Sequence, residues 1–170
     1  MNLYFRFIWF LLVHKFRPKG EALESYVVPY RVWPTDLDFL MHMTNSKYFA
    51  LMDLSRVNFM VRNGMWKQVS KRGWYPVVAA QWMDYYRSLS LLQKFTVETT
   101  VESWDDKFVY LRQDFISGGK KCASALVCAR FLKKSGGGVG PDELIEAMGE
   151  KDIVSPELSP EILAWRAQRG

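Results

Sequence analysis

The sequence predicts an α+β fold in which an antiparallel sheet wraps around one long apolar helix. Residues 46–64 contain no proline, and their apolar side chains recur at helical spacing. Residues 74–133 are instead rich in aromatic and β-branched side chains and are divided by short turns, which is typical of strands in series. Such a sheet can bury one face against the helix and so form the core of the domain.

The helix at residues 46–64 begins after a group of capping residues. Thr44 or Asn45, followed by Ser46, supplies side-chain oxygens that can accept hydrogen bonds at a helix start. The segment is apolar around most of its circumference, so it should be buried, and about 28 Å of helix would span a small domain. Gly64 is a natural stop, because glycine readily takes the left-handed conformation at a helix end.

The other elements are predicted from composition and turn residues. A first strand is expected at residues 25–32, with Pro29 placing it at an edge or bending it, and a short helix at residues 65–72. Four further strands are predicted at residues 74–87, 94–104, 108–117 and 120–133. Small side chains on the last strand share the face that we place under the long helix: Ala123, Ala125, Val127 and Ala129.

The chain divides into three regions by composition. Residues 1–20 form an apolar and basic N-terminal segment, and residues 21–134 form the main domain. Residues 135–170 begin with SGGGVGP, which predicts a flexible linker because it lacks the lysine of a phosphate-binding loop. Two short helices are expected after it, at residues 142–148 and 156–167, on the outside of the domain.

The N-terminal segment permits two interpretations. Residues 3–13 are apolar except for Arg6, and basic residues follow up to Lys19. The stretch is too short for a spanning helix, which needs about 20 apolar residues, and it lacks the pattern of a cleaved signal peptide. It is either an element packed on the domain or at a dimer contact, or an interfacial anchor through which residues 3–19 contact a membrane peripherally.

The composition predicts an oligomer. A chain of 170 residues with 49% hydrophobic content is long enough for one domain with a proper core. Aromatic residues make up 15% of the chain, including seven tryptophans and eleven phenylalanines. A single copy would leave part of this apolar surface exposed, so we expect a homodimer or a tetramer.

Charge, cysteines and histidines limit the class of partner. The net charge of +5 suits a phosphate-bearing ligand or an acidic surface, but the basic residues are scattered and no nucleic-acid motif is visible. Cys122 and Cys128 would lie about 20 Å apart on one strand, against about 5.5 Å for bridged Cα atoms, so they cannot pair. Free cysteines without a signal peptide predict a cytoplasmic location. With His14 and His42 as the only histidines, no metal site is predicted.

A carboxylate before the long helix is the main chemical signal. Asp36 and Asp38 precede His42 in the loop that leads into the helix. The unpaired N–H groups and partial positive charge of a helix start can hold a carbonyl oxygen that becomes anionic during acyl transfer. From these residues alone, the aspartate could equally be a helix cap and the histidine a structural residue, so both interpretations stay open.

The spacing of these residues resembles the entry motif of the hotdog-fold thioesterases of the 4-hydroxybenzoyl-CoA thioesterase type. In that family an Asp-x-Asp loop leads into His-x-Asn-Asn, a tyrosine three residues on, and an acidic residue and an arginine along the helix. The matching residues are Asp36, Asp38, His42, Asn45, Tyr48, Asp53 and Arg56. Met41 replaces the usual glycine, and Thr44 replaces the first asparagine. The resemblance, which extends over residues 25–134, implies the hotdog fold.

The resemblance also implies hydrolysis of an acyl thioester, above all acyl-CoA, with coenzyme A as part of the substrate and no other cofactor. Asp38 would be the general base for water or a direct nucleophile, with Asn45 and His42 as further catalytic residues. The backbone amides of Met43, Thr44 and Asn45 would stabilise the oxyanion.

Four further side chains are candidates for substrate binding. Gln81 could position the substrate, whereas Tyr48 could contact it or fix the helix to its partner. Lys120 and Lys121 could meet coenzyme A phosphates or protect a sheet edge. The alternative function is a non-catalytic acyl-binding or membrane-associated scaffold of the same fold, which Met41 favours because glycine normally permits close approach of the substrate.

Overall fold

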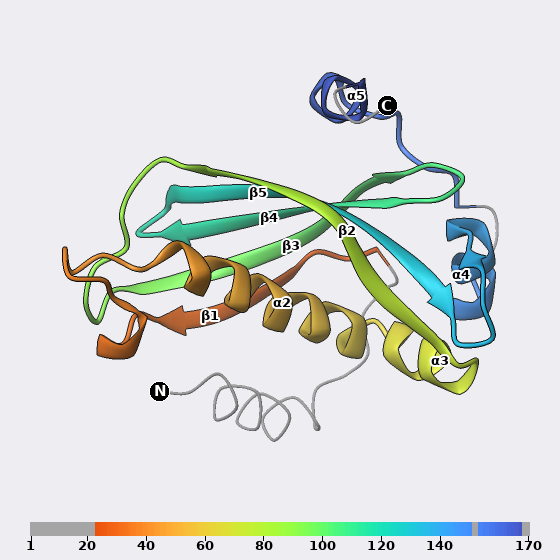
Figure 1. The fold of residues 1–170 in the computed structure, drawn as a ribbon, viewed down its shortest axis with the longest axis horizontal. Coiled ribbons are helices and arrows are strands. Elements are labelled where there is room, and N and C mark those ends of the chain that lie inside the picture. Colours follow the sequence, from red (N-terminus) through yellow and green to blue (C-terminus); the bar gives the residue numbers. More distant parts are fainter. Residues whose placement is uncertain (1–22, 151–152, 168–170) are drawn as a thin grey trace.

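The computed structural model describes residues 23–150 and 153–167, so the predicted N-terminal segment at residues 1–20 lies outside the described part. An antiparallel sheet curls over one long helix. Two short helices lie together at one end of the sheet, and a third lies on the face opposite the long helix (Figure 1). The elements are β1 (Tyr26–Arg31), the 3₁₀ turn η1 (Pro34–Asp36), α2 (Asn45–Arg62), α3 (Met65–Lys71), β2 (Trp74–Tyr85), β3 (Lys94–Trp104), β4 (Val109–Ser117), β5 (Lys120–Lys133), β6 (Gly138–Val139), α4 (Pro141–Met148) and α5 (Pro160–Ala167).

The sheet has the order β1-β3-β4-β5-β2, with every neighbouring pair antiparallel. The predicted bounds of β3 and β5 agree with the structure. The other three observed strands, β1, β2 and β4, are shorter than predicted by one or two residues at one or both ends. β2 comes directly after the helices in the sequence, yet it pairs with β5. It is last in the strand order and therefore forms an edge of the sheet. Within the described residues, β5 is its only strand partner.

The long helix α2 is buried against the concave face of the sheet. Leu51 and Met52 belong to one core cluster with Val97 of β3 and Phe115 of β4, all of them fully buried. The small side chains of β5 join this cluster, as predicted: Ala123, Ala125, Val127 and Ala129. Burial of each large side chain contributes about 1.5–3 kcal/mol, so this cluster fixes the helix on the sheet.

The predicted linker at residues 135–141 is instead a hairpin. Gly136 and Gly137 have φ angles of 100° and 87°, and the chain then returns along β5 as strand β6, with Val139 opposite Phe131. Glycine takes these angles without steric cost, which permits the tight return. Helix α4 follows at once, and its Leu144 is buried in a second core cluster with Phe59 of α2.

The last helix covers the convex face of the sheet, opposite α2 (Figure 1). Ile162 and Trp165 of α5 pack on Tyr110 and Leu126, whose side chains point away from the α2 side. The helix begins at Pro160 rather than at residue 156, so its predicted start was wrong. The preceding segment is held to the sheet instead, because the Ser155 hydroxyl bonds the backbone of Trp104.

The prediction for the two cysteines can be compared with the structure, whereas the prediction for residues 3–13 lies outside the described residues. Cys122 and Cys128 are both free and buried, in agreement with the strand argument. No helix in the described ranges is long and apolar enough to cross a bilayer.

Candidate active site

The loop that holds Asp38 is closed by its own hydrogen bonds. The Asp38 amide donates to the carbonyl of His42 (2.9 Å), and the Met41 amide donates to the carbonyl of Asp38 (3.1 Å). The side-chain oxygen Oδ1 of Asp38 accepts the amides of Leu40 (2.9 Å) and His42 (3.1 Å). The other carboxylate oxygen accepts no hydrogen bond from the described residues, so it is the oxygen available for chemistry.

The helix start offers fewer oxyanion donors than the sequence predicted. The amide of Met43 donates to the carbonyl of Leu89, and that of Thr44 donates to the carbonyl of Asp36, each at 2.9 Å. Both of these predicted oxyanion donors are therefore engaged in hydrogen bonds within the fold in this structure. The amides of Asn45 and Ser46, the first two of α2, make no hydrogen bond with described residues.

Met41 keeps the backbone conformation that glycine would give. Its φ is 61°, in the left-handed region that bulky side chains rarely occupy. The turn is thus retained at a strain of about 1–2 kcal/mol. The methionine side chain is more than half exposed and extends from the loop surface.

Asp36 is a structural residue. Its side chain is 1% exposed, and its carboxylate accepts the amide of Trp33 at 2.9 Å and lies 3.7 Å from the ammonium group of Lys47. These contacts tie the start of the loop to the first turn of α2. Asp36 therefore stabilises the start of the loop, whereas Asp38 lies in the turn itself.

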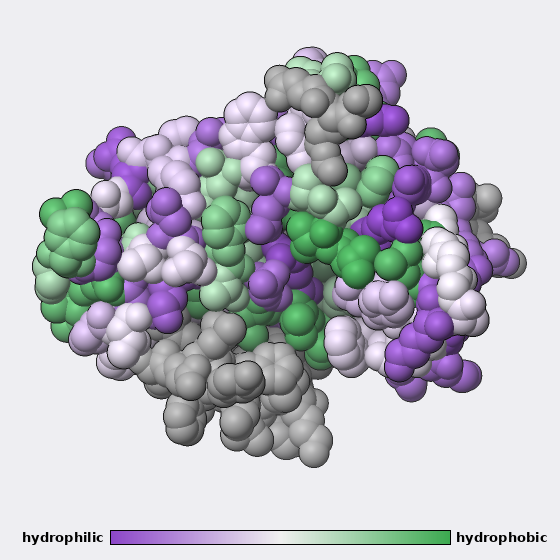
Figure 2. Space-filling model, viewed as in Figure 1, coloured by the Kyte–Doolittle hydropathy of each residue, from purple (hydrophilic) through white to green (hydrophobic). Residues whose placement is uncertain are grey.

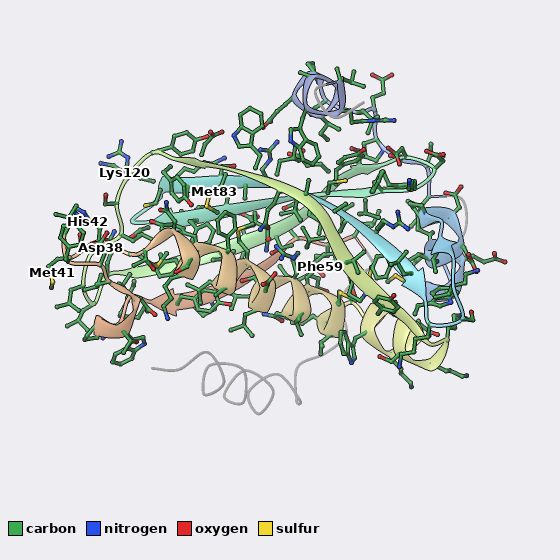
Figure 3. All side chains as sticks on the ribbon, in the orientation of Figure 1. Asp38, Met41, His42, Phe59, Met83 and Lys120 are labelled. Atoms are coloured by element: carbon green, nitrogen blue, oxygen red, sulfur yellow. The ribbon has the colours of Figure 1, made fainter. Side chains whose placement is uncertain are left out.

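His42 and Asn45 present exposed side chains at the same end of the molecule. Neither side chain makes a hydrogen bond with the described residues, so both are available to a ligand. The His42 backbone pairs with Ser90 in the connection between β2 and β3. Figure 3 shows His42, Asp38 and Met41 together at the end of the molecule where α2 begins.

Tyr48, for which substrate contact and attachment of the helix were both predicted, lies in the core. Its ring centroid is 5.1 Å from that of Tyr85 and 4.9 Å from that of Phe115, and the side chain is almost fully buried. This burial raises the pKa of the Tyr48 hydroxyl to about 12. Tyr48 therefore fixes α2 to the sheet, which is the second of these roles.

The remaining predicted binding residues are exposed but spread over the sheet. Gln81 of β2 lies opposite Val127 of β5, and about 13 Å of strand separates Gln81 from the end of β2 at Tyr85. Lys121 forms an ion pair with Asp114 (2.7 Å), whereas Lys120 makes no ion pair with described residues. The structure brings Lys120 to the end of the molecule that holds Asp38, and it does not bring Gln81 there (Figure 3).

An apolar cavity of about 250 Å³ lies beside the C-terminal half of α2. The sequence analysis did not predict it, because its walls come from α2 and four different strands together with α3 and α4. Apolar side chains form most of its wall, among them Val57, Met60, Val78, Leu111 and Phe131. Of the described residues that line it, only Asp53 and Arg56 are polar.

Arg56 connects this cavity to a buried polar network. Its guanidinium donates to Asp53 and, at 2.5 Å, to the side-chain oxygen of Gln113. The Gln113 amide in turn donates to the carbonyl of Met52 (3.1 Å) and to the hydroxyl of Thr99 (2.9 Å). Burial lowers the pKa of Arg56 from its ordinary value, and the charge of Asp53 opposes that shift. The network fixes the middle of α2 to β3 and β4.

Comparison with known families decides what kind of protein this is. The model of the thioesterase-like superfamily matches residues 32–166, which is most of the chain. The chain belongs to this superfamily. The family match includes the loop of Asp38, all of α2 and both C-terminal helices, so the predicted relationship to thioesterases is confirmed.

Two curated relatives support the assignment to the thioesterase-like superfamily. Protein THEM6 of Xenopus laevis is 34% identical over 145 residues, which cover 85% of this chain and 69% of the relative. A probable thioesterase of Saccharomyces cerevisiae is 27% identical over 150 residues, covering 87% of this chain and 63% of the relative. The predicted class of enzyme, a thioester hydrolase, is confirmed at the level of the family.

Solved structures confirm the hotdog fold of this thioesterase-like chain. YbaW, a probable thioesterase from Escherichia coli, superposes with a TM-score of 0.68 at 19% identity, covering 72% of this chain and 95% of the other. A 4-hydroxybenzoyl CoA thioesterase variant complexed with 4-hydroxybenzoyl CoA superposes with a TM-score of 0.65 at 18% identity, covering 73% and 98%. At these identities the likeness concerns the fold.

Proposed function

We propose that this chain hydrolyses acyl-CoA thioesters with Asp38 as the catalytic carboxylate. The observation that carries the proposal is the geometry of that side chain. One of its oxygens is held by two amides while the other is open, and the first two amides of α2 are unpaired nearby in the same connection. The membership of the chain in the thioesterase-like superfamily supports the same reaction class.

Asp38 and the first amides of α2 would have different roles in the reaction. The open oxygen of Asp38 would attack the thioester carbonyl or remove a proton from an attacking water. The amides of Asn45 and Ser46, at the positive end of α2, would stabilise the oxyanion, and one such donor is typically worth about 2.7–4 kcal/mol. The C–S bond then breaks, the thiolate takes up a proton, and water supplies the oxygen of the released carboxylic acid.

The position of the cavity favours a long aliphatic acyl group. A carbonyl bound at Asn45 lies about 12 Å along the helix from Asp53, where the cavity begins. An acyl chain would follow the face of α2 past Phe49 and then fill the apolar space beside Val57. Short acyl groups would reach none of this apolar surface and would gain nothing from it.

A hydrolysis screen tests the proposal. We expect kcat/KM for palmitoyl-CoA to exceed the values for acetyl-CoA and 4-hydroxybenzoyl-CoA by about tenfold or more, since each buried methylene contributes about 0.8 kcal/mol. Release of free thiol measures the rate. Val57→Phe, which fills the cavity, should remove this preference while leaving hydrolysis of acetyl-CoA unchanged. Equal rates on all three thioesters would contradict the chain-length argument.

The acyl-binding scaffold remains the alternative function. The feature that favours it is Met41, which stands where the entry motif of the thioesterases has glycine. A scaffold would bind palmitoyl-CoA in equilibrium dialysis and release no thiol on any substrate in the screen.

We also propose that two copies pair through β2. This strand has twelve residues, β5 is its only strand partner among the described residues, and its exposed side chains include Tyr75, Val78 and Trp82. A long apolar edge of this kind is a template for another strand. Symmetric pairing of two edges would bury these side chains and extend the sheet across the dimer.

Sedimentation equilibrium tests this assembly. We expect about twice the chain mass of 19.9 kDa at micromolar concentration. Val78→Lys places a charge on the edge and should shift the population toward single chains. Leu163→Lys, at a somewhat more exposed position on α5, should leave the dimer intact. A single-chain mass for the unaltered protein would contradict the proposal.

A further inference from the structure

Five large apolar side chains are exposed together at the end of the molecule where α2 begins. Phe39 is 91% exposed, Leu40 60% and Met41 53%, and all three lie in the loop between Asp38 and His42. Leu91 and Leu92, from the connection between β2 and β3, are 41% and 51% exposed. We refer to these five residues as the apolar tip, and Figure 2 shows hydrophobic side chains gathered at this end.

The two loops of the apolar tip form one unit. His42 pairs with Ser90, the Met43 amide donates to the carbonyl of Leu89 at 2.9 Å, and the Leu92 amide donates to the carbonyl of Val32 at 3.0 Å. Figure 1 shows the two connections side by side at the left end of the view. Their apolar side chains are therefore presented together on a fixed backbone rather than on separate loops.

The apolar tip is maintained against backbone strain. Met41 and Leu92 have φ angles of 61° and 59°, and they are the described non-glycine residues with positive φ. Such angles disfavour a bulky side chain by about 1–2 kcal/mol, and glycine would remove that cost. Strain retained at exposed apolar residues points to a function of those side chains outside the fold.

Basic side chains surround the apolar tip. The three segments that meet there, residues 31–47, 84–94 and 117–122, carry six lysines and arginines against three aspartates, of which Asp36 is buried. Arg87, Lys94 and Lys120 are exposed and make no ion pair with described residues. The Arg87 amide donates to the carbonyl of Cys122 at 3.0 Å, and Cys122 is two residues from Lys120, so these two basic residues lie on adjoining segments.

We infer that the apolar tip inserts into the surface of an anionic lipid membrane. Exposed apolar side chains would enter the boundary between headgroups and acyl chains, while Arg87, Lys94 and Lys120 would meet lipid phosphates. This contact is separate from the one predicted for residues 3–19, and it does not depend on thioester hydrolysis. It would place Asp38, which adjoins Phe39, at the membrane surface.

The charge of this end favours a membrane over a second copy of the chain. A symmetric contact through the apolar tip would bring the basic residues of two copies face to face, and like charges across a contact are costly. An anionic surface instead gains from each of them, about fivefold in binding per lysine or arginine near the headgroups.

The test places an environment-sensitive fluorophore on the tip of the full chain. Cys122 and Cys128 are buried, so a thiol-reactive dye should label the introduced cysteine of Phe39→Cys selectively. The matched control is Val154→Cys, because Val154 is 84% exposed and lies outside the apolar tip. With vesicles of phosphatidylcholine and phosphatidylserine, we expect the dye at position 39 to shift to an apolar emission. The dye at position 154 should keep its aqueous emission.

Variants complete the test. Phe39→Ser with Leu40→Ser should weaken vesicle binding about tenfold or more, and Arg87→Gln with Lys120→Gln about 25-fold on anionic vesicles only. Leu163→Ser is the control for a change at an exposed apolar residue. The inference is overturned if the protein binds vesicles while the dye at position 39 stays in water, or if no vesicle binding occurs. It is also overturned if the dye shifts without vesicles as protein concentration rises, which would show that a second copy covers the tip.

Discussion

Asp38→Asn is expected to lower kcat for thioester hydrolysis by about 10² to 10⁴-fold, because it removes the carboxylate charge that a base or nucleophile requires. Asparagine retains a side-chain oxygen that can accept the amides of Leu40 and His42, so the loop should keep its conformation. Steady-state kinetics on the best substrate of the screen, with a thermal unfolding curve for each variant, provide the measurement. Substrate binding should change little, since the cavity is untouched.

Two other aspartates serve as controls for Asp38. Asp53→Asn tests whether a second carboxylate could be the catalytic group, since Asp53 lines the apolar cavity and pairs with Arg56. Asp36→Asn should act on stability, because Asp36 is buried and accepts the Trp33 amide. The role of Asp38 would be rejected if its substitution lowered kcat by less than about tenfold, which is an increase of about 1.4 kcal/mol in the activation barrier, or if Asp53→Asn alone abolished turnover.

Arg56→Ala is expected to destabilise the fold by about 1–3 kcal/mol, because it leaves a buried hydrogen-bond acceptor unsatisfied. The substitution removes the cation that pairs with Asp53 and leaves the buried Gln113 oxygen without its donor, while the Gln113 amide stays bound to Met52 and Thr99. Gln113 is fully buried, and an unsatisfied group there costs more than a lost surface contact. Urea unfolding of both proteins gives the difference in free energy of unfolding.

Arg72→Ala is the matched control for Arg56. Arg72, at the C-terminal end of α3, is exposed. It bonds the side chain and backbone of the nearby Gln68 and lies over the ring of Trp74, 5.5 Å from the centroid, so its loss should cost about 1 kcal/mol or less. Gln113→Leu in the Arg56→Ala background should recover part of the lost stability, because it removes the unsatisfied amide oxygen. Equal effects of Arg56→Ala and Arg72→Ala would show that the network does not stabilise the fold.

Local sequence patterns were sufficient for the elements that position the site. The alternating residues of β3 and the glycine pair at Gly118 and Gly119, both at positive φ, determine where β3, β4 and β5 begin and end. The helix α2 followed from apolar periodicity, and the loop of Asp38 from the spacing of its polar residues. Each of these signals depends on neighbours within a few positions along the chain.

Contacts between distant segments decided the rest. Whether Met43 and Thr44 could donate to an oxyanion depended on the carbonyls of Leu89 and Asp36, and the first of these lies 46 residues away in the sequence. The apolar cavity and the partners of Gln113 likewise exist only where separate strands and helices meet. The sequence by itself determined the fold class, the long helix and the carboxylate before it. Only the tertiary structure decided which amides remain free, where an acyl chain could lie and which apolar residues face outward, because hydrogen bonds and burial depend on which distant segments pack together.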